Sequence, residues 1–353
     1  MNYLQQRIIV DGRSIGSEQA CFIIAEVGVN HNGDANIAHK MVDAIADAGA
    51  DCVKFQTFSA AEFVNGDNEI YEYVSQGKTV RESQLALFTR LELKREVFAQ
   101  LFEHTRQRGL IPLSTPADKG ACDLLEGLNV GGYKIGSDDL VHTPFLEYVA
   151  TKNKPIILSS GMADGEDIQR ALDTIQSAGN NQVCVLHCVS LYPTPDGDVN
   201  LMKIPAMRER FSCPIGFSDH SDGITAAVGA IALGACVVEK HFTLDKSMAG
   251  PDHRFSANPE ELSRMINEIR RMEAVLGRPD IKPTAGEIKM REIARRSIVV
   301  GQGLPAGHVI SFDDLAFQRP GTGLMPYEAE KIIGKKLKIA IKAKDLITFN
   351  HLI

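Results

Sequence analysis

The chain has 353 residues, a net charge of −7, 44% hydrophobic and 24% charged residues, and no tryptophan. This length suits one large domain with a small one attached, and the acidic balance argues against a nucleic-acid-binding surface. No apolar run is long enough to cross a membrane, and the first residues lack the apolar core of a signal peptide. The seven cysteines are scattered without a CxxC pair, as reduced thiols usually are. We therefore expect a cytoplasmic protein that binds neither nucleic acid nor membrane.

Short apolar segments alternate with helical patterns as far as residue 276. The predicted strands are Cys21–Gly28, Cys52–Phe58, Leu110–Thr115, Gly132–Gly136, Pro155–Ser160, Gln182–Val189, Cys213–Ser218 and Cys236–Phe242. The clearest predicted helices are Asn36–Ala48, Lys94–Arg108, Glu166–Ala178 and Pro259–Leu276. Eight such strands alternating with helices predict an α/β fold, a (β/α)8 TIM barrel over residues 1–276. An open doubly wound sheet is the alternative, but no GxGxxG follows the first strand.

Two segments interrupt this alternation. Residues 59–93 are too long for a βα loop and predict a lid or hairpin over the barrel mouth, the carboxyl end of the strands. Residues 277–293 contain Pro279, Pro283 and Gly286 and predict a linker. In residues 294–353, short β runs separated by Gly and Pro predict a small β-rich domain.

Two of the predicted strand ends carry an imidazole, His220 and His241, one βα unit apart. Because neighbouring parallel strands end at the same edge, both side chains are expected at the barrel mouth, where barrels of this kind place their chemistry. A lone buried histidine is more often a satisfied core residue than a ligand. Two at matching strand ends favour a site for a divalent cation.

The other strand ends are also polar. Period-two spacing puts Lys54 with Gln56, and Glu239 with His241, on common sides of their strands. Lysines and hydroxyls that converge on one mouth suit a phosphorylated anionic substrate, and two buried lysines without an anion would cost several kcal/mol. A single serine among these residues is more simply explained as a polar cap. The set comprises Glu26, Lys54, Gln56, Ser114, Thr115, Lys134, Ser137, Ser159, Ser160, His187, Ser190, Tyr192, Ser218 and Glu239.

These residues alone predict a metal-dependent lyase or transferase that acts on a phosphorylated small molecule. A Schiff-base aldolase that uses Lys54 or Lys134 is one alternative, and it would stay active in chelator. A carbohydrate-binding or ice-binding protein with an inactive barrel is another. That alternative predicts the loss of a barrel ligand, yet Glu26, His220 and His241 are all present.

The motifs resemble the sialic acid synthase family, which includes legionaminic and pseudaminic acid synthases and joins phosphoenolpyruvate to an N-acetylated hexose. The resemblance covers nearly the whole chain in order. In the barrel it rests on Phe22–Asp34, Val53–Phe58, Pro155–Met162, His187–Pro195, Gly216–His220, Glu239–Thr243 and Gly250–Ser256. In the tail it rests on Arg296–Ile298, Leu304–Ile310, Arg319–Gly323 and Ile332–Lys335, which resemble the family's antifreeze-like (SAF) domain.

The resemblance implies roles for individual residues. His220 and His241 would hold Mn²⁺, Mg²⁺ or another divalent cation, and Glu26 would handle protons. The phosphoenolpyruvate site would comprise Lys54, Thr115, Lys134, Ser137 and Ser160. The sugar and its surrounding polar network would involve Gln56, Ser190, Tyr192, Ser218, Glu239 and Asp252.

The resemblance also implies a domain-swapped homodimer, in which Arg319 reaches the partner's barrel and contacts the N-acyl group of the sugar. The expected sugar is N-acetylmannosamine, giving N-acetylneuraminate and phosphate. Ser190 stands where sialic acid synthases often have Asn, and a smaller side chain leaves room for a second acyl group. A 2,4-diacetamido-2,4,6-trideoxymannose, giving legionaminic acid, is therefore the alternative.

Overall fold

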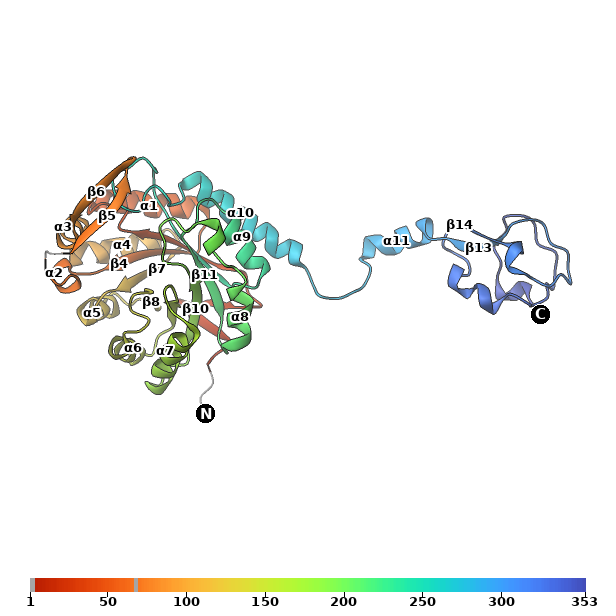
Figure 1. Cartoon of the computed structure of the whole chain (residues 1–353), viewed down its shortest axis with the longest axis horizontal. Coiled ribbons are helices and arrows are strands. Elements are labelled where there is room, and N and C mark those ends of the chain that lie inside the picture. Colours follow the sequence, from red (N-terminus) through yellow and green to blue (C-terminus); the bar gives the residue numbers. More distant parts are fainter. Residues whose placement is uncertain (1–3, 67–68) are drawn as a thin grey trace. The chain divides into compact units, whose positions relative to one another are not determined.

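The computed structural model describes residues 4–66 and 69–353, and the chain divides into two units, Met1–Gly277 and Arg278–Ile353. The first unit contains a sheet of eight parallel strands (Figure 1), which lie in the order β7-β4-β3-β12-β11-β10-β9-β8. The end strands β7 and β8 also contact each other, so the barrel nearly closes. This confirms the predicted TIM barrel. The strands are β3 (Phe22–Gly28), β4 (Cys52–Thr57), β7 (Ile111–Pro116), β8 (Tyr133–Ile135), β9 (Ile156–Ser159), β10 (Val183–Cys188), β11 (Ile215–Asp219) and β12 (Val237–His241).

Helices follow the strands and surround the barrel (Figure 1). Helix α1 shows how the sequence sets their limits: the Asp34 carboxylate caps the first turn, and Gly49 ends the helix with a φ of 87°. Its apolar residues at helical spacing, from Ala38 to Ile45, are buried against the barrel. The barrel helices are α1 (Ala35–Ala48), α4 (Arg95–Gln107), α5 (Lys119–Gly127), α6 (Thr143–Ala150), α7 (Gly165–Ser177), α8 (Lys203–Arg210), α9 (Thr225–Ala232) and α10 (Pro259–Leu276), with the short helix η1 (Asp196–Asp198) before α8.

A hairpin that the sequence did not predict precedes the barrel. Strands β1 (Arg7–Val10) and β2 (Arg13–Gly16) pair through an Asp11-Gly12 turn in which both residues have positive φ. Ile8, Val10 and Ile15 are buried in the barrel's own core. The hairpin therefore extends that core beyond the eight strands.

The inserted segment between β4 and helix α4 contains the predicted hairpin together with two helices. Its elements are α2 (Ala60–Phe63), β5 (Ile70–Ser75), β6 (Lys78–Ser83) and α3 (Gln84–Leu91). Figure 1 shows the β5–β6 hairpin at the edge of the barrel. The hairpin is tied to the loop after β12, because Gln76 Nε2 donates to the Ser247 carbonyl at 2.9 Å and Ser75 Oγ accepts from the Gly250 amide at 3.0 Å.

The second unit has its own apolar core around Ile298, Ile332 and Ile347. Strands β13 (Ser297–Val300) and β14 (Leu315–Gln318) pair antiparallel, and isolated bridges join the later β runs, which fits the predicted β-rich domain. Short helices η2 (Phe312–Asp314), η3 (Pro326–Lys331) and η4 (Phe349–His351) connect them. Helix α11 (Ala285–Ala294) occupies most of the segment predicted as a linker. Among the described residues, every helix is too short or too polar to span a membrane.

Candidate active site

A cavity of about 530 Å³ opens at the barrel mouth. Its lining includes thirteen of the predicted site residues: Glu26, Lys54, Gln56, Thr115, Lys134, Ser137, Ser190, Tyr192, Ser218, His220, Glu239, His241 and Asp252. Ser160 is not in the lining, and Arg319 belongs to the second unit. The eight strands therefore bring most of the predicted site residues together in one cavity.

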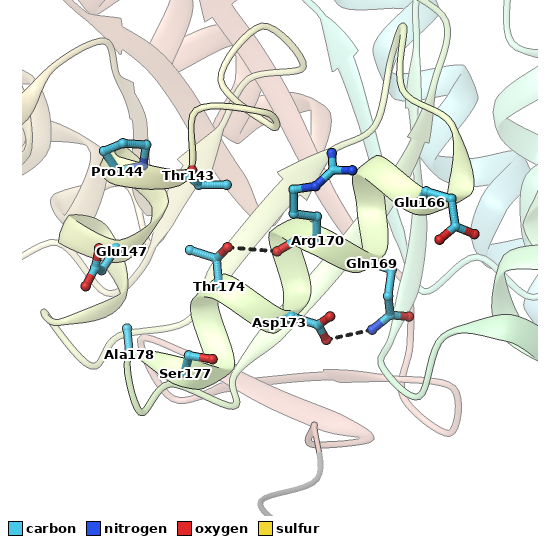
Figure 2. A pocket seen from close by; sticks show the side chains of 10 residues that line it. All are labelled: Thr143, Pro144, Glu147, Glu166, Gln169, Arg170, Asp173, Thr174, Ser177 and Ala178. Carbon is cyan, nitrogen blue, oxygen red and sulfur yellow. Dashed lines mark hydrogen bonds between the residues drawn. The ribbon is translucent and has the colours of Figure 1, made fainter.

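Another hollow, of about 640 Å³, lies between α6 and α7 (Figure 2). Two of its polar side chains bond along helix α7: Gln169 Nε2 donates to Asp173 Oδ1, and Thr174 Oγ1 donates to the Arg170 carbonyl. No predicted site residue lines it. This hollow is a groove between two surface helices, so we place the candidate active site at the barrel mouth.

Strand register brings Glu26 to the centre of the site. In the ladders of β3, Glu26 pairs with Lys54 on one side and with His241 on the other. Its carboxylate receives Lys54 Nζ at 2.7 Å and Gln56 Nε2 at 3.0 Å, and its other oxygen lies 3.3 Å from His241 Nε2. Burial alone would raise the pKa of Glu26, but the charges of His241 and Lys54 outweigh it and hold that pKa well below its usual range.

Glu239 lies between the two buried lysines. Its oxygens are 3.5 Å from Lys54 Nζ and 3.5 Å from Lys134 Nζ, and Ser218 Oγ donates to it at 2.9 Å. Burial lowers the pKa of Lys134, whereas at Lys54 the carboxylates of Glu239 and Glu26 outweigh burial and raise the pKa. The Glu239 carboxylate therefore balances the positive charges of the two buried ammonium groups before substrate binds.

Of the predicted serines at the ends of β8 and β9, Ser137 and Ser159 line the cavity, whereas Ser160 does not. Lys134 Nζ donates to Ser159 Oγ at 2.7 Å, and Ser159 lines the cavity. Ser160 Oγ instead donates to the Leu186 carbonyl at 2.8 Å. Ser137 Oγ accepts from the Gly161 amide, and a Cβ on Gly161 would collide with the hydroxyls of Ser137 and Ser190. Glycine at position 161 therefore leaves room for both hydroxyls beside the backbone.

The two imidazoles lie side by side with their ring centroids 5.3 Å apart. His220 Nδ1 contacts the Val189 carbonyl at 2.8 Å, while the buried Nδ1 of His241 has no hydrogen-bond partner among the described residues. Burial lowers the pKa of His241. At His220 burial acts in the same direction, but the hydrogen bond and charge of Cys188, the Val189 carbonyl and the charge of Glu26 together outweigh it and raise the pKa.

Within the described residues, no three His, Cys, Asp or Glu side chains are arranged to hold a metal ion. Among the described residues, the neighbouring imidazoles of His220 and His241 are the candidate ligands for a divalent cation. The unpartnered Nδ1 of His241 is consistent with such a site, because a buried ring nitrogen without a partner is costly.

Two residues stand at the rim around the imidazoles. The Tyr192 ring lies 4.3 Å from the His220 ring and 5.5 Å from that of Phe255, centroid to centroid, and 45% of Tyr192 is exposed. Asp252 Oδ2 is 3.7 Å from His241 Nδ1, and burial raises the pKa of this carboxyl. Both side chains line the cavity beside the imidazoles.

Sequence reasoning missed part of the lining. Asp138 and Asp139 follow Ser137 and face the cavity, and their position directly after a strand end could have indicated them. It also missed an apolar side built by the segment between β4 and β7. That side comprises Val29, Phe58, Phe63, Leu87, Phe88 and Leu91, which we call the apolar wall.

Comparison with known proteins gives the family of the chain. Residues 41–280 match the model of the NeuB family, and residues 295–353 match the SAF domain. The chain belongs to the NeuB family. Members of the NeuB family condense phosphoenolpyruvate with sugars, so the protein is an enzyme, and the resemblance stated from the motifs is confirmed.

Individual NeuB-family proteins are similar over almost the entire chain. The N,N'-diacetyllegionaminic acid synthase of Legionella pneumophila is 40% identical over 96% of each chain. The human N-acetylneuraminate-9-phosphate synthase is 34% identical over 95% of this chain and 94% of its own. A crystal structure of the N-acetylneuraminic acid synthetase of Leptospira borgpetersenii in complex with citrate has a TM-score of 0.74 and 32% identity, and covers 82% of this chain and 96% of that chain.

Proposed function

We propose that this NeuB-family enzyme condenses phosphoenolpyruvate with an N-acylated amino-hexose and water and releases phosphate. One observation carries the proposal: two buried lysines and two neighbouring imidazoles meet in a single cavity, with the carboxylates of Glu26 and Glu239 between them. This arrangement offers cations to a trianionic substrate at one end and ligand nitrogens to a carbonyl oxygen at the other.

Phosphoenolpyruvate is assigned to the inner part of the cavity. Lys54 and Lys134 would bind its phosphate and carboxylate, with hydroxyls from Thr115, Ser137 and Ser159 as further donors. Ser159 takes the place that the motifs gave to Ser160, because the Ser160 hydroxyl is engaged with a backbone carbonyl. When the anion binds, its charges would replace Glu239 as the counter-charge of the two lysines.

The sugar is assigned to the outer part, as its open-chain aldehyde. Gln56, Ser190, Tyr192 and Asp252 would position its hydroxyl and N-acyl groups. A divalent cation held by His220 and His241, Mn²⁺ or Mg²⁺, would supply a Lewis acid for the aldehyde oxygen when bound.

The reaction forms one carbon–carbon bond, forms a bond from C2 to the oxygen of water, and breaks the C2–oxygen bond to phosphate. C3 of phosphoenolpyruvate attacks the aldehyde carbon, water adds at C2, and C2 then expels phosphate to leave the keto group. Glu26 would take the proton from the water or from a sugar hydroxyl, which is supported by its carboxylate having one oxygen toward Lys54 and the other toward His241.

The sequence motifs favour N-acetylmannosamine as the sugar, which would give N-acetylneuraminate. A specific observation favours 2,4-diacetamido-2,4,6-trideoxymannose as the second candidate: the legionaminic acid synthase of L. pneumophila is 40% identical, against 34% for the human 9-phosphate synthase.

We further propose a cytoplasmic, domain-swapped homodimer, in which Arg319 from the SAF domain contacts the N-acyl group at the partner's barrel mouth.

Phosphate release tests the proposal. The purified chain is stripped of metal and assayed with phosphoenolpyruvate, with and without added Mn²⁺, against each of the two sugars. We expect release that requires both the metal and a sugar. Activity retained in chelator, with a lysine trapped by borohydride and a keto acid, would support a Schiff-base aldolase instead. No release with either sugar would contradict the proposed reaction.

A further inference from the structure

We infer that the apolar wall is a specificity subsite that takes an uncharged methyl-bearing substituent of the sugar and excludes a phosphate ester. The substituent is the methyl of a 6-deoxy position or of an N-acyl group. This inference rests on the proposed condensation and concerns the sugar alone. It follows from two independent features of the cavity, its aromatic side and its distribution of charge.

The aromatic side is a small cluster separate from the barrel core. The rings of Phe58, Phe63 and Phe88 lie 4.9 to 5.9 Å apart, centroid to centroid, and all three line the cavity that contains the imidazoles. Phe58 is buried, but 39% of Phe63 is exposed. An aromatic surface left open inside a substrate cavity gains free energy when an apolar group covers it.

The same wall is also held close to the polar part of the site. Tyr71, on strand β5 of the inserted segment, lines the cavity, and the negative charge of Asp252 adds to burial in raising its pKa. The hairpin that carries Tyr71 is bonded to the loop preceding Asp252 through Ser75 and Gly250. The wall and the rim carboxylate thus belong to one connected surface around the sugar.

The distribution of charge opposes a second phosphate. Among the described residues that line the cavity, Lys54 and Lys134 are the two lysine or arginine side chains, both are ion-paired, and both are assigned to phosphoenolpyruvate. Five carboxylates line the same cavity: Glu26, Asp138, Asp139, Glu239 and Asp252. Bound phosphate groups usually need arginine, lysine or a helix N-terminus. The further cation proposed for this mouth, Arg319, is assigned to the N-acyl group, so a phosphorylated sugar would meet repulsion here.

This separates the chain from one of its relatives in substrate class. Adding three carbons of phosphoenolpyruvate to a hexose makes C6 of the sugar into C9 of the product, so a 9-phosphate product requires a 6-phosphate sugar. The human relative is named for such a product. For this chain we assign a sugar without phosphate whose far end is apolar, and the 2,4-diacetamido-2,4,6-trideoxymannose fits best because it carries three methyl groups.

The test compares three sugars at saturating phosphoenolpyruvate and Mn²⁺: N-acetylmannosamine, its 6-phosphate, and 2,4-diacetamido-2,4,6-trideoxymannose. We expect kcat/KM for the trideoxy sugar to exceed that for N-acetylmannosamine by about 10-fold or more, as a methyl in an apolar pocket provides. The 6-phosphate should be about 100-fold poorer than N-acetylmannosamine, because of the repulsion. A 6-phosphate used as well as N-acetylmannosamine would overturn the inference. Release with none of the three would instead contradict the proposed reaction itself.

Variants of the wall locate the effect. Phe63→Ala should raise the KM for the trideoxy sugar about 10-fold and leave the KM for phosphoenolpyruvate unchanged, whereas Phe63→Leu should keep most of the affinity. Ile70→Ala is the matched control, because Ile70 lies on the same inserted segment, is 54% exposed and does not line the cavity. Circular dichroism and melting curves check that each variant folds. A folded Phe63→Ala protein with an unchanged preference among the sugars would refute the subsite.

Discussion

Lys54 Nζ lies 2.7 Å from Glu26 Oε1 inside the barrel, and only 4% and 3% of the two side chains are exposed. A buried pair of this kind seldom improves stability over an apolar pair, because desolvation offsets the attraction. Its retention at the centre of the cavity is better explained by function: the ammonium is kept charged and ready for an anion, and the carboxylate is kept deprotonated beside His241.

Removing the charge of Lys54 should weaken binding of phosphoenolpyruvate specifically. In Lys54→Met the substrate loses a cation, and Glu26 loses its closest partner, so we expect the KM for phosphoenolpyruvate to rise by about 100-fold or more. The stability should also fall by about 3 kcal/mol or more, since a buried carboxylate is left without compensation. Phosphate release as a function of phosphoenolpyruvate concentration and denaturant melts measure the two effects. An unchanged KM would remove Lys54 from the substrate site.

Loss of either imidazole should abolish metal-dependent turnover. His220→Ala and His241→Ala each leave one protein nitrogen for the cation, so we expect Mn²⁺ affinity to fall by about 100-fold and phosphate release to be lost. Electron paramagnetic resonance of free Mn²⁺ measures the affinity without relying on activity. His187→Gln is a matched control: His187 is equally buried, but its Nε2 contacts the Val199 carbonyl outside the cavity. Near-normal turnover by either alanine variant would refute the metal assignment.

Substitution of Arg319 should affect the sugar and spare the other substrate. If the SAF domain completes a partner's site, Arg319→Ala should raise the KM of the sugar about 10-fold or more, by loss of a charge-assisted hydrogen bond. The KM of phosphoenolpyruvate should not change. Steady-state kinetics with each substrate varied in turn, together with light scattering for the oligomeric state, checks this. An effect confined to phosphoenolpyruvate, or a fully active monomer, would contradict the proposed swap.

A second buried ion pair supports the histidines from the other side of their strands. Lys240 Nζ lies 2.8 Å from Asp219 Oδ2, with 2% and 0% of the side chains exposed, and also donates to the Ser221 carbonyl. Asp219→Ala should cost about 3–5 kcal/mol of stability, because it leaves the ammonium buried and unpaired. The double variant Asp219→Leu, Lys240→Met should recover most of this loss.

Chemical denaturation measures the cost of breaking that pair. Glu72→Ala serves as the control, since Glu72 pairs with Arg81 on an exposed hairpin and should change stability by about 0.5 kcal/mol or less. An Asp219→Ala protein as stable as the control would show that the buried pair does not hold the ends of β11 and β12.

Stability should decline with pH through the titration of Asp139. Burial, and then the charge of Asp138, raise the pKa of Asp139 to about 7 from 3.8. Between pH 4 and 7 the unfolded chain therefore loses a proton that the folded chain keeps, so folding is progressively disfavoured as pH rises. In Asp139→Asn this pH-dependent loss of stability, about 1–2 kcal/mol between pH 4 and 7, should disappear. The figure allows for solvent screening, because the side chain is partly exposed. Denaturant midpoints of both proteins from pH 4.5 to 8 measure it; a constant difference across this range would contradict the assignment.

The barrel and its polar strand ends could be predicted because both depend on local pattern. Eight apolar runs at regular spacing specify the strands, and period-two alternation turns Glu239 and His241 to the same side. The pattern could not choose between Ser159 and Ser160. Adjacent residues point to opposite faces, and only the pairing of β9 with its neighbours decides which serine faces Lys134.

The apolar wall was not predictable in the same way. Phe58, Phe63 and Phe88 are separated by up to 30 positions, and their meeting depends on how the inserted segment folds back over the mouth. Helix α11 had a local signal that was outweighed by its neighbouring prolines and glycine: Thr284 and Glu287 form a capping box at its start. The β1–β2 hairpin likewise had an Asp11-Gly12 turn between alternating residues.

The proposed chemistry and the proposed choice of sugar belong to different parts of the chain. Glu26, Lys54 and His241 are fixed by the hydrogen-bond ladders of three adjacent strands, whereas the apolar wall is built largely by residues between β4 and β7. Strands β5 and β6 of the inserted segment form a two-stranded sheet apart from the eight barrel strands, so we expect an exchange of that segment to leave the barrel register intact. A chimera that carries a relative's segment on this barrel would then accept a different sugar while handling phosphoenolpyruvate as before, so new nine-carbon acids could arise by grafting one insertion onto an unchanged catalytic barrel.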